Sequence, residues 1–227
     1  MGGQACILYG GAEFSRDIDL SIGIDSENLR AVKHALDQLE AHLVFFPVLE
    51  VEALKRGHAC HFRCQAEGVE GLRIDLMAKM RGCPEFNELW DRRSIVDVPG
   101  IGEIGLLSLP DLVCAKKTQR EKDWPMIRRL IETDISANLA QADEARVVFW
   151  LQECRTPMLL GKLAKDYPAL CQQVKTQRPL LEAALSQNFT ALEDLLHSEE
   201  KKEKEKDRVH WQPLRQELEQ WRRQRKE

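Results

Sequence analysis

Residues 17 to 22, Asp-Ile-Asp-Leu-Ser-Ile, alternate between polar and apolar side chains. This period of two predicts a β-strand with one buried and one exposed face. Asp17 and Asp19 are two residues apart, so their carboxylates leave the same face of such a strand. Two like charges held that close repel each other unless a cation lies between them. The pattern therefore favours a sheet that binds a cation, although an Asp-x-Asp pair alone is also typical of a turn or an exposed strand face.

Other patterns predict a mixed α/β arrangement around this strand. An apolar stretch at residues 5–9 suits one or two helical turns, and Asp25-Ser26 offers capping oxygens for a helix extending to about Leu43. The turn-rich residues 67–71 separate two strand candidates and indicate a hairpin. Its strands are predicted at Ala59 to Gln65 and Leu72 to Met77.

The second half of the chain has helical patterns only, beginning at about Asp123. We predict a mixed α/β domain at residues 1–135, a helical domain at 136–197 and a charged helical tail at 198–227. Every residue from 199 to 208 is charged, with both signs interspersed, which favours an exposed helix or a mobile tail. The fold class expected is therefore α/β (α+β), with a mixed sheet flanked by helices and a helical C-terminal region.

The composition of the chain indicates the compartment in which the protein is expected to work. The chain holds 33 Lys and Arg against 37 Asp and Glu, a formal net charge of −4, so any nucleic-acid contact needs a local basic patch. Its longest apolar run, Leu43 to Leu49, is too short to span a bilayer, and no secretory signal opens the sequence. Seven cysteines at scattered spacings suit reduced thiols. We expect a cytoplasmic protein without a membrane segment.

A third acidic residue, Asp75, lies on the predicted strand at 72–77. Magnesium prefers hard oxygen ligands and is often bound by a few carboxylates together with substrate phosphates. The Gly2-Gly3 pair at the start of a helix would present bare N–H groups to a phosphate. Together these features predict a two-metal phosphoryl-transfer site, although a glycine pair by itself commonly marks a turn.

These residues carry a resemblance to a known family. Gly-Gly, then Ser-Arg-Asp-Ile-Asp-Leu, then a later strand aspartate resemble the signature of the polymerase-β-type nucleotidyltransferase superfamily. Within it, the segments are similar to the minimal nucleotidyltransferases and the AbiEii-type toxins. Leu109-Pro-Asp-Leu-Val leading into Lys116-Lys117 and then Lys122-Asp123 adds to the similarity. The resemblance covers about residues 1–135.

The resemblance implies roles for individual residues. Asp17 and Asp19 would hold Mg²⁺, and Asp75 would complete the metal site or act as a base toward the acceptor hydroxyl. Gly2-Gly3 would cradle the phosphates of the nucleotide, with Ser15 as a hydroxyl donor beside them.

A basic helix face is the second part of the implied site. Lys116 would pair with the triphosphate, and on a helix running to about residue 120 it shares a face with Arg120 and Asp123. Lys116 and Arg120 are accordingly taken as nucleotide-binding residues. An ordinary solvated face explains the two cations equally simply, and for Asp123 we favour a cap on the helix that begins at Trp124.

The implied reaction moves an NMP from an NTP such as ATP to an acceptor hydroxyl. The acceptor would be an RNA end such as tRNA, a protein or a small molecule, and the family suggests a toxin–antitoxin or phage-defence setting with a cognate antitoxin. The alternative is a non-catalytic nucleotide-binding or antitoxin-like interaction protein that keeps the fold. Two departures favour it: the Gly-Gly stands at positions 2 and 3, and Met126 stands where related sequences carry an aspartate.

Three weaker patterns have structural interpretations. His58, Cys60, His61 and Cys64 invite a zinc site, but strand alternation puts His61 on the face opposite the cysteines, which favours buried thiols. The five tryptophans are interpreted chiefly as packing anchors. The basic segment 221–226 is interpreted as a solvated tail, with contact to RNA or a partner as the alternative.

Overall fold

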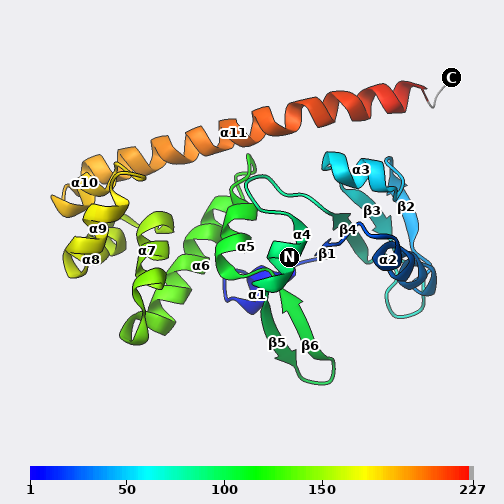
Figure 1. The fold of residues 1–227 in the computed structure, drawn as a ribbon, viewed down its shortest axis with the longest axis horizontal. Coiled ribbons are helices and arrows are strands. Elements are labelled where there is room, and N and C mark those ends of the chain that lie inside the picture. Colours follow the sequence, from blue (N-terminus) through cyan, green and yellow to red (C-terminus); the bar gives the residue numbers. More distant parts are fainter. Residues whose placement is uncertain (225–227) are drawn as a thin grey trace. The chain divides into compact units, whose positions relative to one another are not determined.

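The computed structural model describes residues 1–224, which form two compact units. Unit 1 comprises Met1–Leu8, Ala12–Ala115 and the residues from Arg208 onward, and unit 2 comprises Tyr9–Gly11 and Lys116–Asp207. This division differs from boundaries at 135 and 197, because the chain leaves the first unit after Ala115 and returns to it at Arg208. The fold class is the mixed α/β type expected, with a helical C-terminal region (Figure 1).

Unit 1 contains both sheets of the protein. Its elements from α1 to α5 are α1 (Gly2–Leu8), β1 (Asp17–Ser21), α2 (Ser26–Gln38), β2 (His42–Phe45), α3 (Val51–Arg56), β3 (Cys60–Arg63), β4 (Arg73–Met77), α4 (Phe86–Asp91), β5 (Ser94–Val98), β6 (Gly102–Leu106) and α5 (Leu109–Lys116).

The main sheet has four strands in the order β1-β4-β3-β2. Strand β1 runs parallel to β4, and the other neighbours are antiparallel. The strands expected at 17–22, 59–65 and 72–77 are confirmed, as is the hairpin between the last two. Glycine is needed in this hairpin at Gly68 and Gly71, whose backbones adopt φ values of +83° and +79°.

One face of this sheet is the core of unit 1. Helices α2 and α3 contribute Leu29, Leu36 and Leu54 to a cluster with buried side chains from strands β3 and β4. Those strand residues are Cys60, Phe62, Ile74 and Leu76, with Ile18 packed against them. The interpretation of Cys60 and Cys64 as buried thiols is confirmed, and burial raises the pKa of Cys60 to about 11.

Helix α2 is shorter than predicted. Its N-terminal cap is as expected, because the Asp25 carboxylate accepts a hydrogen bond from the backbone N–H of Asn28 at 2.8 Å. The helix nevertheless ends at Gln38, and Glu40 adopts a left-handed φ of +47°. The expected extension to Leu43 is wrong, because that residue pairs with Phe62 across strands β2 and β3. Pairing with a neighbouring strand overrides the helical periodicity there.

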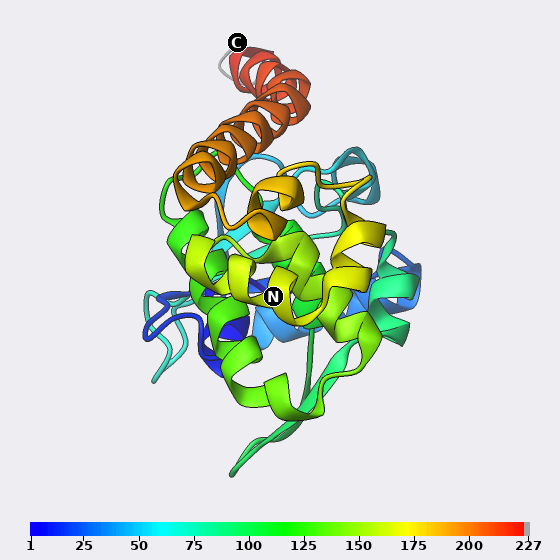
Figure 2. The ribbon, with the colours of Figure 1, turned by 90° about the vertical axis from the view of Figure 1, so that its left-hand side faces the viewer.

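Strands β5 and β6 form a separate two-stranded antiparallel ribbon (Figures 1 and 2). Near its base, Trp90 at the end of α4 is 50% exposed, stacks on Phe86 and lies beneath the guanidinium of Arg93. The interpretation of this tryptophan as a packing anchor is therefore wrong, whereas Trp124 and Trp150 are buried as expected.

Unit 2 is helical. It consists of α6 (Asp123–Asn138), a 3₁₀ turn (Leu139–Gln141), α7 (Glu144–Glu153), α8 (Pro157–Asp166), α9 (Pro168–Val174), α10 (Leu181–Leu185) and the first part of α11 (Phe189–Gln224). The apolar sides of these helices enclose a core whose largest member is Trp150. Thr156 occupies the N-cap position of α8, directly before Pro157.

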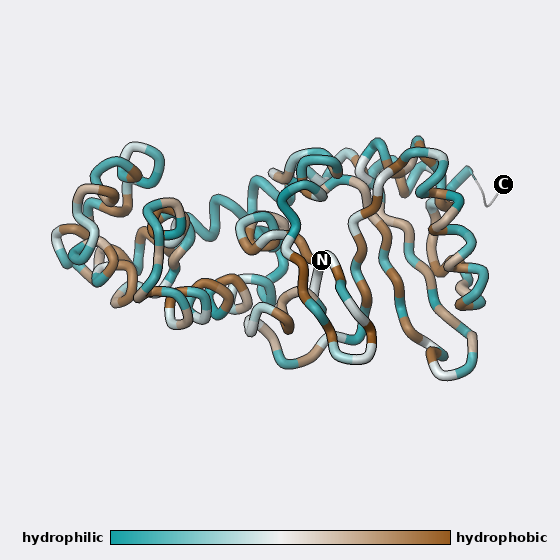
Figure 3. The backbone as a smooth tube through the Cα atoms, turned by 60° about the horizontal axis from the view of Figure 1, so that its bottom comes forward, coloured by the Kyte–Doolittle hydropathy of each residue, from teal (hydrophilic) through white to brown (hydrophobic). Residues whose placement is uncertain are grey.

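The charged run at 199–208 is part of α11 and is not a separate tail. The helix is mostly hydrophilic in Figure 3. Several of its charges nevertheless have partners within unit 2: Asp207 is buried and accepts a hydrogen bond from the backbone N–H of Gln119, and Lys204 pairs with Glu121. The solvated interpretation is wrong for these residues.

Further along α11, Trp221 belongs to unit 1 and packs there against the rings of Phe46 and His58. The last residues of the basic segment, 225 and 226, lie outside the described part of the chain. Within residues 1–224, no helix is both long enough and apolar enough to cross a membrane.

Candidate functional site

The face of the main sheet opposite its apolar core is polar. Strand register arranges this face in two cross-strand rows, which we call the outer row and the inner row. The outer row is Asp17, Arg73, Arg63 and His42; the inner row is Asp19, Asp75, His61 and Phe45. Each row runs from β1 through β4 and β3 to β2, so carboxylates stand at one edge and basic or aromatic side chains at the other.

Asp75 is the most constrained acidic residue of this face. Its Oδ1 accepts hydrogen bonds from Arg73 Nε at 2.8 Å and from His61 Nδ1 at 2.8 Å. Its side chain is 11% exposed. Burial alone would raise the pKa of Asp75, but the hydrogen bonds and charges of His61 and Arg73 outweigh it and hold this pKa below its ordinary value. Asp75 is therefore a carboxylate that keeps its charge at neutral pH.

Arg73 is held by the carboxylates around it. Its hydrogen bond to Asp75, with further attraction from Asp17 and Asp19, raises the pKa of its guanidinium against the cost of burial. Arg73 thus balances part of the negative charge of the three aspartates. Strand β4 therefore contributes a cation to this face as well as the carboxylate of Asp75, which was the only residue of β4 expected at the site.

Helix α1 lies against the carboxylate edge. A Cβ on Gly2 would overlap Oδ2 of Asp19, and a Cβ on Gly3 would overlap Oγ of Ser15. Gly2 also has a φ of +67°, and the N–H of Gly3 donates to Oδ2 of Asp19 at 3.4 Å. Both glycines are therefore required by close approach to β1 and the segment before it. The structure brings Gly2, Gly3, Ser15 and Asp19 together, as expected from the sequence.

The donor set suits Mg²⁺ in its chemistry, because Asp17, Asp19 and Asp75 offer hard oxygen ligands on neighbouring strands. Asp19 and Asp75 are direct cross-strand partners. The carboxylate of Asp75, however, is hydrogen-bonded to Arg73 and His61 in this structure. In the part of the chain described, no three His, Cys, Asp or Glu side chains gather into a metal-binding group.

The basic pair Lys116 and Arg120 belongs to unit 2, whereas the aspartates belong to unit 1. Helix α5 ends at Lys116, so the expectation that these two cations share one helix is wrong. They converge instead on Asp123, whose Oδ2 accepts a hydrogen bond from Arg120 Nε at 2.9 Å. Lys116 Nζ lies 3.6 Å from its Oδ1.

Asp123 itself is fully buried and is the first residue of α6. The expectation that it caps this helix is wrong: the N-cap is Lys122, and the Asp123 carboxylate accepts a hydrogen bond from Thr118 Oγ1 at 2.5 Å. It serves as the central anion for the loop between α5 and α6, because a buried carboxylate requires cationic and hydroxyl partners.

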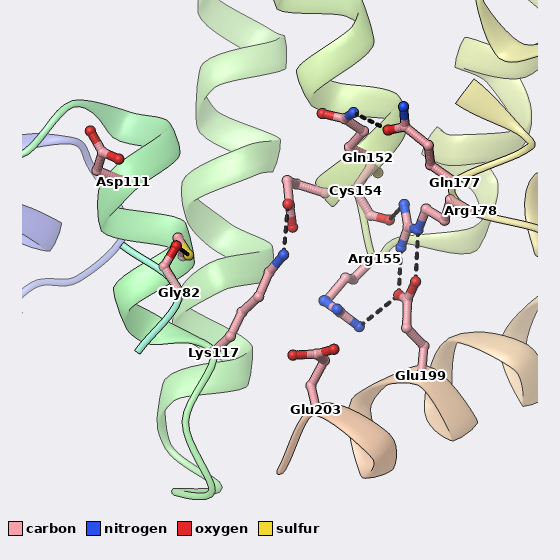
Figure 4. A network of polar contacts seen from close by, with 12 residues as sticks. Gly82, Asp111, Lys117, Gln152, Cys154, Arg155, Gln177, Arg178, Glu199 and Glu203 are labelled. Atoms are coloured by element: carbon pink, nitrogen blue, oxygen red, sulfur yellow. Dashed lines mark hydrogen bonds and ion pairs between the residues drawn. The ribbon is translucent and has the colours of Figure 1, made fainter. Parts of the chain in front are cut away.

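Unit 2 also contains a second ion cluster, drawn in Figure 4. Two buried arginines, Arg155 and Arg178, share the carboxylate of Glu199: Arg178 binds it through Nε and Nη2, and Arg155 Nη1 lies 3.2 Å from it. Arg178 Nη1 also donates to the carbonyls of Leu151 and Cys154. The cluster joins α11 to the segments around α7, although Nε and Nη1 of Arg155 are buried without a hydrogen-bond partner among the described residues.

Sequence reasoning missed Arg73, His61 and Arg63 as residues of the site. Alternation placed His61 and Arg63 opposite the cysteines, and Arg73 is two residues before Asp75, so the signal was present in the strand pattern. Only the order of the strands shows that these side chains share the face with Asp17 and Asp19.

Comparisons with known proteins do not assign this chain to a family. No protein-family model matches the chain, and the search of curated proteins finds no significant match.

Proposed function

We propose that this chain is a Mg²⁺-dependent nucleotidyltransferase that moves an NMP from an NTP to an acceptor hydroxyl. The observation that carries the proposal is the strand register that makes Asp19 and Asp75 neighbours, with Asp17 on the same face. Three carboxylates on one sheet face repel each other, and Arg73 balances only part of their charge, which favours binding of a further cation. The contact of Gly2 and Gly3 with Asp19 and Ser15 further supports a compact site at this edge.

The proposed reaction is a single displacement at phosphorus. The acceptor oxygen bonds to the α-phosphorus of the NTP, the bond from this phosphorus to the bridging oxygen breaks, and pyrophosphate leaves with the electron pair. The proton of the hydroxyl passes to the pair formed by Asp75 and His61, whose atoms Oδ1 and Nδ1 are 2.8 Å apart. Asp17, Asp19 and Asp75 would hold Mg²⁺, which supplies neutralisation of the phosphate charge when bound.

Two further groups would contribute to binding of the nucleotide. The Gly3 N–H donates to Oδ2 of Asp19 and the Ser15 hydroxyl donates to the carbonyl of Asp17, so both would have to exchange these partners for phosphate oxygens when the nucleotide binds. Lys116 and Arg120 belong to unit 2 and are held there by Asp123, so their pairing with the triphosphate stays a prediction of the resemblance and is not part of this proposal.

A labelling assay tests the proposal. The full chain is incubated with Mg²⁺, each α-labelled NTP in turn, and either pooled tRNA or cell lysate as a source of acceptors. The Asp17→Asn, Asp19→Asn double variant should transfer no label, whereas Asp37→Asn, an exposed carboxylate on α2, should transfer as much as the unaltered chain. Label that enters an acceptor equally with all three proteins would contradict the proposal.

A second candidate is a nucleotide-binding protein without turnover, which includes an antitoxin-like partner. The specific observation in its favour is that Asp75 is already held by Arg73 and His61. In the same assay this candidate predicts Mg²⁺-dependent NTP binding, measured by calorimetry, without any transfer of label. Absence of NTP binding would contradict both candidates.

A further inference from the structure

The proposed reaction needs an acceptor, and no residues have yet been assigned to its binding. The proposed nucleotide site occupies the β1 side of the polar face of the main sheet, so the side formed by β3 and β2 is available for the acceptor. Helix α1 and the carboxylates stand at the β1 edge, while Arg63, His61 and Phe45 stand on β3 and β2 beyond Asp75. Neighbouring strands are about 4.8 Å apart, so this second half begins one strand away from Asp75. We call these three side chains the acceptor half.

Arg63 is the first unusual feature of the acceptor half. It pairs directly across the strands with Arg73, which places two guanidinium groups side by side on one face. Like charges directly opposite each other destabilise a sheet, and an anion between them removes the penalty. Arg73 is neutralised by Asp75, whereas Arg63 is exposed and its side chain makes no hydrogen bond or ion pair within residues 1–224.

Phe45 is the second unusual feature. A register shift between Leu43 and Phe45 inserts one extra residue in β2, which turns Phe45 away from the apolar core and onto the polar face. There its side chain is 51% exposed and meets the ring of His61 edge to face, with ring centroids 6.2 Å apart. Arg63 lies on the neighbouring strand β3, in the outer row, so the acceptor half offers an exposed aromatic ring and an exposed arginine, the two kinds of group with which proteins bind single strands.

We propose that the acceptor half binds a single-stranded nucleic acid, with backbone phosphate on Arg63 and a base stacked on Phe45. This inference rests on the proposed function for the chemical outcome, but the binding itself does not require transfer. It agrees with the net charge of −4, because a single strand needs only a local cation and a stacking platform.

Fluorescence anisotropy with a labelled twelve-nucleotide RNA, and DNA of the same sequence, tests the inference without NTP or Mg²⁺. Arg63→Glu should weaken binding of the single strand by about tenfold or more. Phe45→Ala should weaken it by about fivefold or more, since base stacking on an aromatic ring contributes strongly. The matched control is Arg30→Glu on α2, which makes the same charge change on the helix that covers the opposite face of the sheet. The RNA and DNA arms show which sugar is preferred.

The outcomes separate this inference from the proposed function. Single-strand binding that Arg63→Glu loses and Arg30→Glu keeps, together with no transfer of NMP, would support the inference and contradict transferase activity. Transfer of label to a protein hydroxyl by a chain that binds no oligonucleotide would overturn the inference and leave the activity intact. Equal affinity of Arg63→Glu and Arg30→Glu would also overturn it. Circular dichroism of each variant excludes loss of folding as the cause.

Discussion

The carboxylate of Glu217 lies 2.7 Å from Nε2 of His58, although 159 positions separate the two residues in the chain. The His58 side chain is 1% exposed, so this hydrogen bond satisfies a buried polar group. Trp221, one helical turn beyond Glu217, packs on both His58 and Phe46, and Arg56 also pairs with Glu217. The last turns of α11 are thereby attached to the segment from β2 to β3, which carries the acceptor half.

Glu217→Ala should release these last turns of α11 from unit 1. The change leaves buried His58 without its partner, a loss of about 1–3 kcal/mol. Native-state hydrogen exchange should then speed up across residues 208–224, and Glu217→Gln, which keeps an acceptor oxygen, should show a smaller effect. Glu219→Ala, an exposed carboxylate on the same helix, is the control. Unchanged exchange in Glu217→Ala would show that Trp221 alone holds the segment.

Glu199→Ala should strongly destabilise unit 2. Arg155 and Arg178 are 6% and 5% exposed, and removal of their shared carboxylate leaves two buried cations uncompensated, at a cost of about 3–5 kcal/mol. Glu193→Ala, an exposed carboxylate earlier in α11, should change stability little. Urea denaturation followed by tryptophan fluorescence measures both variants, and equal midpoints would contradict the structural role of the cluster.

Gly161→Ala should lower stability even though alanine is the better helix former. The residue lies inside α8, where the propensity gain is at most about 1 kcal/mol. A Cβ there would lie 2.5 Å from the Phe189 ring, and such overpacking costs about 1–3 kcal/mol. The double variant with Phe189→Leu should recover part of the loss in a thermal melt. A higher melting temperature in Gly161→Ala alone would show that the ring moves freely.

The stability of the β3–β4 region should fall at acidic pH because of Asp75. Its pKa in the folded protein lies below the value of about 3.9 in an unfolded chain, so the folded state binds fewer protons. The stabilisation is fully present above the unfolded value and is lost as pH falls through the folded pKa. Hydrogen exchange of β3 and β4 amides, followed from pH 6 downward, should show this loss.

The matched variant for this pH effect is Asp75→Asn, which removes the titrating group. Its β3 and β4 amides should be less protected at neutral pH and should lose less further protection on acidification. An identical pH dependence in Asp75→Asn and the unaltered chain would show that another group is responsible.

Local patterns in the sequence were enough for much of the first unit. Alternation along residues 17–22 and 72–77, glycines at the hairpin turn and the Asp25 cap each depend on side chains a few positions apart, and all are confirmed. The same alternation put Asp17 and Asp19 on one face. The end of α2 was missed because the competing partner of Leu43, strand β3, lies about 20 residues further along the chain.

The contacts that define the candidate site were decided by tertiary structure. Asp19 meets Asp75, and Asp75 meets His61, only because β4 is placed between β1 and β3. Lys116 pairs with Asp123 because a buried carboxylate requires a nearby cation. The periodicity of one helix does not predict this pairing, because it does not show which carboxylates become buried. The sequence by itself determined which side chains share a strand face and most of the segments that become strands and helices, with the end of α2 and strand β2 as exceptions. Strand order and burial decided which of those charges meet, because these depend on packing between segments far apart in the chain.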